Sequence, residues 1–281
     1  MNVCYHEMKE MKFAFQIITL IATINLNSQN HSEEWDFYLC RIDDKPASIY
    51  LDLGLNEIAA QGDRANLFWV SVQMNNPRED GLSSDTESKK LWEIEDLIVG
   101  LITSKHDAIY AGRLTNDGKR DFYFYFEKEQ LLDKSISEIM VRFPEYSYDY
   151  GIKENDNWES YLSFLYPSPR ELQSILNRRV LEQLQKHGDD LTKSRIVDHW
   201  IYFKSDIDRT LFEKEIIQRN FTIKTKDFDK QYSEYPFKLQ ISREDKVGWD
   251  EIDEYTIELW ELANQFNGDY DGWECPILKK D

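Results

Sequence analysis

The chain of 281 residues carries 53 acidic side chains against 34 Lys and Arg, which gives a formal net charge of −19. Apolar residues make up 41 % and aromatic residues 14 % of the chain, a composition too apolar for an intrinsically disordered protein. The acidity argues against binding to a nucleic-acid backbone or to an anionic membrane, because both depend on Lys and Arg. The acidity favours a basic protein partner. The alternative is that the negative charge serves only to keep the protein soluble.

The first thirty residues are predicted to be a leader. Lys9 and Lys12 precede about fourteen mostly apolar residues, 13–26, which suits the core of a signal peptide and is short for a membrane span. If the leader is a signal peptide, the protein is exported or periplasmic, with no stable membrane association after its removal. Otherwise the protein is cytoplasmic.

The first predicted domain covers residues 31–168. Strands are expected at 35–42, 48–53 and 67–74, followed by a helix at 86–103 that Ser84 or Asp85 caps. Two strands at 108–114 and 120–126 flank Asp117-Gly118, a hairpin signal. A helix at 128–143 and a strand at 146–153 follow. From residue 67 the order is strand, helix, strand, strand, helix, strand, the ferredoxin-like order.

The second predicted domain covers residues 169–281. After a short packed helix and linker at 157–169, a helix is expected at 169–188, with Pro169 in its first position. The same six-element order then returns: strand 195–204, helix 206–219, strands 221–228 and 237–243, helix 249–266, and a last strand within 268–278. The predicted fold is therefore α+β, with two tandem ferredoxin-like units whose antiparallel sheets pack against helices.

Neither catalytic motifs nor metal-ligand spacings occur in the sequence, so no catalytic residue, metal or cofactor is predicted. Cys4, Cys40 and Cys275 show no CxxC spacing, and pairing of Cys40 with Cys275 stays open for an exported chain. His199 is expected to be a structural histidine, and His187 a favourable charge at a helix C-terminus. A hydrolase in the first domain is one alternative; it requires a deep pocket in which carboxylates converge with His106.

Aromatic strand residues are also found in sheets that bind single-stranded RNA. Trp200 and Tyr202 share one face of a predicted strand, but no basic and aromatic signature of such sites is visible on the strands. Core packing against helices explains the pair at least as well, so direct binding of nucleic acid is not predicted.

The negative charge is concentrated near the C-terminus. Residues 244–274 contain eleven acidic side chains and one basic side chain, whereas residues 170–243 contain 15 basic and 12 acidic ones. The solvent side of the last helix is expected to carry Asp250, Asp253, Glu254, Glu258 and Glu261. This acidic face lies beside an aromatic and acidic last strand, and we predict that it binds a basic segment of a partner. The alternative is that these acids only face solvent and bind no partner.

Two stretches resemble known families. Gly268-Asp-Tyr-Asp-Gly-Trp-Glu274, after a helix over 255–266, is similar to the end of the regulator of ribonuclease E activity B family, and the likeness extends from about Ser194 to Cys275. Residues from about 34 to 169 resemble the domain-of-unknown-function family 695. The motifs that carry this second resemblance are Glu34-Trp-Asp-Phe-Tyr38, Ala47-Ser-Ile49, Glu95-Asp96, Tyr110-Ala-Gly-Arg113, Asp121-Phe-Tyr-Phe-Tyr125 and Trp158-Glu-Ser-Tyr161.

The resemblance implies a non-catalytic regulator that binds and inhibits an endoribonuclease of the ribonuclease E type. The predicted partner-binding residues are the five acids of the last helix together with Tyr270, Asp271 and Trp273. Gly272 is expected to serve the backbone geometry, and core packing is the alternative role for Trp273. An exported binding module of unknown ligand is the remaining alternative.

Overall fold

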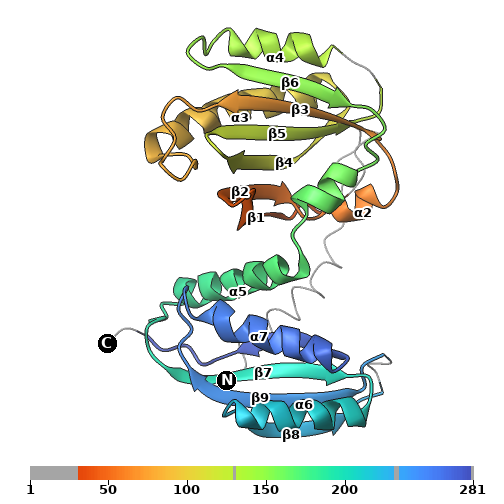
Figure 1. Cartoon of the computed structure of the whole chain (residues 1–281), viewed down its shortest axis with the longest axis vertical. Helices are drawn as coiled ribbons and strands as arrows, with labels where there is room; N and C mark the ends of the chain where they lie inside the picture. The colour runs from red at the N-terminus through yellow and green to blue at the C-terminus, as the bar shows by residue number, and fades with distance from the viewer. Residues whose placement is uncertain (1–30, 129–130, 231–233, 280–281) are drawn as a thin grey trace, which may run out of the picture. The chain divides into compact units, whose positions relative to one another are not determined.

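The computed structural model describes residues 31–128, 131–230 and 234–279. It divides into two compact units, one made by the described residues up to Ser168 and the other by those from Pro169 onward (Figure 1). The leader predicted over residues 1–30 lies outside the described residues. Among the helices that are described, none is both long and apolar enough to cross a membrane.

The first unit is built on a six-stranded antiparallel sheet in the order β1-β2-β4-β5-β3-β6. Its strands are β1 Trp35–Ile42, β2 Lys45–Asp52, β3 Asn66–Gln73, β4 Ala108–Asn116, β5 Lys119–Phe126 and β6 Tyr148–Lys153. Its helices are α2 Leu55–Ala59, α3 Asp85–Lys105, α4 Leu132–Met140 and a short π-helix, η2, Tyr161–Leu165. The β1–β2 hairpin extends a four-stranded arrangement consistent with a ferredoxin-like unit.

Alternation along the strands separates the two faces of this sheet. Phe68, Val70 and Val72 point into a core that α3 and α4 cover. Trp69 and Ser71 lie on the other face, the open face. The segment that contains Trp158 and η2 covers one end of the open face: the fully buried Trp158 ring stacks on Tyr125, with centroids 3.8 Å apart.

The second unit contains a four-stranded antiparallel sheet in the order β10-β7-β9-β8. Its elements are α5 Pro169–Lys186, β7 Arg195–Phe203, α6 Asp206–Gln218, β8 Thr222–Phe228, β9 Phe237–Asp245, α7 Ile252–Gln265 and β10 Gly268–Glu274. Helices α6 and α7 share one core, which contains Phe212 and Leu259. Helix α5 packs beside α7 over a second cluster, which contains Leu181, Val197 and Trp273 (Figure 1). The α+β class with two antiparallel sheets is therefore confirmed.

Two predicted helices need correction, and one short helix was not predicted. Helix α7 begins at Ile252 rather than 249, because Trp249 and Asp250 form a turn that the Ile252 N–H closes onto the Gly248 carbonyl at 3.1 Å. Helix α4 is shorter than the predicted 128–143. Helix α2 has only five residues, too few to show helical periodicity in the sequence. At α3 the cap is Ser84, whose hydroxyl accepts the Glu87 N–H.

Candidate partner-binding site

The five acids predicted for the last helix occupy different environments. Asp250 and Glu254 are exposed at the beginning of α7, and the described residues offer neither of them an ion pair. Asp250 lies in the turn before the helix rather than on it. These two side chains therefore present unpaired carboxylates at the surface.

Two other acids of α7 face arginines. Glu258 accepts a 2.8 Å hydrogen bond from Arg219, at the end of α6, and Glu261 is bonded to Arg170 of α5. Side chains of all four residues are at least about a third exposed, so these pairs contribute little to stability. They do lower the net negative charge along this part of the helix, so the acidic face is narrower than predicted.

Asp253 belongs to a buried polar network. Asn177 of α5 donates to Asp253 at 2.6 Å and to the Thr256 hydroxyl at 2.7 Å. Its carbonyl oxygen accepts the indole N–H of Trp273 at 2.9 Å. Asn177 is 3 % exposed and Trp273 is 6 % exposed. This placement corrects the prediction for Trp273: the ring packs in the core and holds β10 against α5, so it does not offer a surface to a partner.

Tyr270 is buried as well, and its hydroxyl lies 2.8 Å from Nδ1 of His199. Burial raises the pKa of Tyr270 well above its ordinary value, so the phenol stays protonated and is able to donate to the imidazole. Both residues lie on the helix-covered side of the sheet, so the prediction that Tyr270 contacts a partner also needs correction. The structural role predicted for His199 is confirmed.

A backbone irregularity explains how Tyr270 and Trp273 both reach the core. In a regular strand, residues three apart point to opposite faces. The register of β10 against β7 shifts between Tyr270 and Gly272, and Gly272 has a φ of +125°. This bulge restores Trp273 to the core side and leaves Asp271 exposed. Glycine fits because other residues rarely adopt this φ, as the sequence suggested.

The face of the second sheet that points away from α6 and α7 carries an acidic pair that the sequence did not identify. Glu274 of β10 lies opposite Asp198 of β7, and burial raises the pKa of both carboxyl groups. Trp200 and Tyr202 lie on this same face, with the Lys238 ammonium 4.4 Å from the Trp200 ring centroid. The two aromatic residues therefore do not pack against α6 and α7, contrary to the core alternative.

His199 makes the second unit sensitive to acid. Burial, aided by Arg243, lowers its pKa from 6.5 to about 3. Between those values the unfolded chain binds a proton that the folded chain does not. Stability is therefore fully present above about pH 6.5 and falls by up to about 1.4 kcal/mol per pH unit toward pH 3. We expect His199→Gln to flatten this dependence, measured by hydrogen exchange of β7 amides from pH 4 to pH 7.

The exposed His187 provides the matched control for this experiment. His187→Gln makes the same substitution at an exposed position and should change the exchange of β7 amides less than His199→Gln does. A slope in the His199→Gln variant equal to that of the unmodified chain would show that carboxyl groups alone cause the acid sensitivity.

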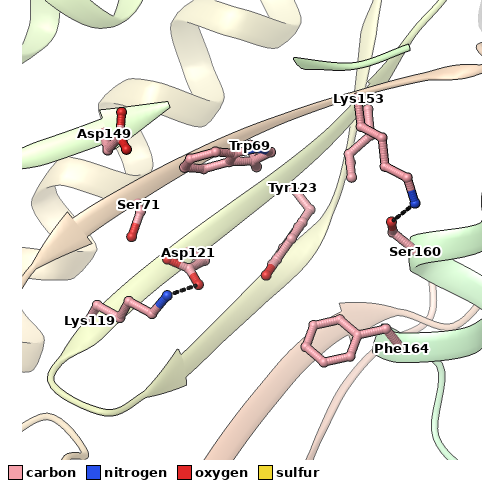
Figure 2. Close-up of a pocket in the computed structure, with 10 residues that line it drawn as sticks. Trp69, Ser71, Lys119, Asp121, Tyr123, Asp149, Lys153, Ser160 and Phe164 are labelled. Atoms are coloured by element: carbon pink, nitrogen blue, oxygen red, sulfur yellow. Dashed lines mark hydrogen bonds and ion pairs between the residues drawn. The ribbon is translucent and has the colours of Figure 1, made fainter. Parts of the chain in front are cut away.

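The first unit has a hollow, a feature that was required only for the hydrolase alternative. It has a volume of about 450 Å³ and lies on the open face of the sheet (Figure 2). Asp121 and Asp149 are among its lining residues, but His106 is not. His106 ends α3 and its Nε2 lies 2.9 Å from the Ser135 hydroxyl of α4, on the helix-covered side. The predicted convergence of carboxylates with His106 is therefore wrong. Among the described residues, no group of His, Cys, Asp and Glu is arranged to hold a metal ion.

Comparison with known families agrees with the division into two units. Residues 33–166 match a family of unknown function, DUF695, and residues 174–275 match the family described as regulator of ribonuclease activity B. The second family is, by its description, one of regulators. The chain thus joins a DUF695 domain to an RraB-like domain, as the resemblance predicted.

Other comparisons add little. No curated protein matches the chain significantly. One similar solved structure is that of a protein assigned as a glycine cleavage system transcriptional repressor, with 10 % sequence identity over 76 % of this chain and 98 % of that one. Its TM-score is 0.21, so this likeness supports no conclusion about fold or function.

Proposed function

We propose that the chain is a non-catalytic regulator that binds an endoribonuclease of the ribonuclease E type and lowers its activity. The observation that carries this proposal is the match of residues 174–275, nearly the whole second unit, to the regulator of ribonuclease activity B family. A regulator needs no catalytic group of its own, and a protein-binding surface is sufficient for inhibition.

The surface that supports the proposal lies where α7 begins: Asp250 is exposed in the turn before the helix and Glu254 in its first turn. The neighbouring Glu258 and Glu261 are bonded to arginines. Most of the electrostatic attraction for a basic partner therefore comes from Asp250 and Glu254. Asp271 is exposed on β10 and adds a further negative charge. A nuclease that binds RNA presents Lys and Arg to the phosphate backbone. Such a basic region is complementary in charge to this acidic surface.

The test combines direct binding with an RNA cleavage assay. The full chain is added to a purified ribonuclease E-type enzyme with a labelled RNA substrate, and we expect slower cleavage as its concentration rises. Reversing the two exposed charges in Asp250→Lys/Glu254→Lys should weaken binding by about tenfold at low salt, because exposed interface charges act mainly through long-range attraction.

The matched control reverses two exposed acids elsewhere on the same unit. Glu182 lies on α5 and Asp227 on β8. Glu182→Lys/Asp227→Lys changes the net charge equally and should keep nearly full inhibition. If the unmodified chain fails to bind the enzyme, the ribonuclease proposal is wrong. If both double variants bind equally weakly, net charge matters and the surface at α7 does not.

A further inference from the structure

The hollow on the open face of the first sheet is built from neighbouring strands in register. Asp121, Ser71 and Asp149 form one row across β5, β3 and β6, and Tyr123, Trp69 and Gly151 form the next row. Ser160 and Phe164, from the segment of η2, close one side (Figure 2). Its volume of about 450 Å³ is within the range of small-ligand sites.

Asp121, which lines this hollow, has one buried carboxylate oxygen that receives no hydrogen bond from the residues the structure describes. Asp121 is 7 % exposed, and its Oδ1 is buried without a partner. The other oxygen, Oδ2, lies 3.4 Å from the Lys119 ammonium. A buried acceptor without a donor is costly, and native proteins rarely keep one without a reason. The position of Asp121 in the hollow indicates a ligand that supplies an N–H or O–H donor.

Aromatic faces line the space next to this carboxylate. The Trp69 ring lies over Gly151, where an added Cβ would be 2.7 Å from the ring. Tyr123 and Phe164 also border the hollow, as Figure 2 shows. Aromatic faces attract flat groups and cations, and a guanidinium is both.

The charge of the whole unit favours a cation over a neutral donor such as a sugar, while Lys119 and Lys153 balance Asp121 and Asp149 among the lining residues. Asp121 and Asp149 flank Ser71 on its two neighbouring strands. Lys153, at the other end of the hollow, is paired with Asp156 at 2.7 Å and Glu159 at 3.5 Å. Residues 33–166 contain 27 acidic and 14 basic side chains, a net charge of −13. This field attracts cationic ligands to the unit.

We propose that this hollow binds an arginine side chain of a partner peptide, with the guanidinium donating to Asp121 and lying against Trp69. The proposal gives the DUF695 domain a binding role of its own. It goes beyond the ribonuclease proposal, which concerns the other unit, and it is tested without a ribonuclease.

The probe is N-acetyl-arginine amide, titrated into the full chain while indole N–H signals are followed by nuclear magnetic resonance. The Trp69 signal is identified by its loss in Trp69→Phe. We expect this signal to shift and saturate at millimolar probe, while signals of tryptophans outside the hollow stay in place. The neutral isostere N-acetyl-citrulline amide should give no saturating shift. Asp121→Asn should weaken binding at least about tenfold, since a hydrogen bond to a charged group is lost.

Asp117→Asn is the matched control. Asp117 is exposed in the β4–β5 turn with a φ of 49°, a backbone that asparagine adopts readily. It removes one negative charge from the same unit and should leave binding within about twofold. Gly151→Ala, which displaces the Trp69 ring, should weaken binding and move the Trp69 signal. Absence of a saturating shift with the arginine probe, an equal response to the citrulline probe, or unchanged affinity in a folded Asp121→Asn chain would each overturn the proposal.

Discussion

Replacing Arg195 by methionine is expected to destabilise the second unit by about 3–5 kcal/mol, because it leaves a buried carboxylate without its cation. The Arg195 and Asp189 side chains are 1 % and 0 % exposed, and they are bonded at 2.5 Å. The guanidinium also donates to the carbonyls of Asp190 and Pro276. It therefore ties the loop before β7 to the segment after β10. Because the chain has two units, hydrogen exchange of β7 amides measures the effect better than a single unfolding curve.

A second variant separates the loss of the pair from the loss of packing. Asp189→Asn combined with Arg195→Met removes both charges and keeps an acceptor for the Leu278 N–H, which Asp189 binds at 2.6 Å. This double variant should be more stable than Arg195→Met alone. Arg170→Met, which breaks an exposed pair with Glu261, should cost no more than about 1 kcal/mol. Equal losses in all three chains would contradict the assignment of Arg195 as a buried structural cation.

The second large effect is expected for Trp273→Ala, which should destabilise the same unit by about 3–5 kcal/mol. The substitution removes a large buried ring from the cluster beneath α5 and leaves the carbonyl oxygen of the buried Asn177 without its donor. Hydrogen exchange of β10 amides measures the change. The family motif that contains Trp273 would then reflect folding rather than contact with a partner.

Trp249 offers a matched control, because it is 46 % exposed in the turn before α7. Trp249→Ala should leave the exchange of β10 amides nearly unchanged. If Trp273→Ala keeps wild-type stability and loses only ribonuclease binding, Trp273 acts at the interface and its structural assignment is wrong.

Local patterns in the sequence were sufficient for most of the architecture. The strand at 35–42 was predicted with the bounds that β1 has. The helix that begins at Pro169 and the helix that Ser84 caps were also located correctly. These features depend on residues close in the chain, namely apolar periodicity, capping side chains and turn residues.

The candidate site was less predictable, because exposure depends on residues far apart in the chain. Glu261 and Arg170 are 91 positions apart, and Trp273 and Asn177 are 96 positions apart. No local pattern connects them. Gly272 within a strand was the one sequence signal for the bulge that turns Trp273 inward.

The sequence by itself determined the α+β class, the repeated element order and the concentration of acids near the C-terminus, since each is a property of composition or short-range periodicity. Only the tertiary structure decided which exposed acids of α7 are paired, because Arg170 of α5 and Arg219 at the end of α6 bond Glu261 and Glu258. It likewise decided that Asp121, Ser71 and Asp149 meet on one face, because strand order and register bring together residues from three separate segments.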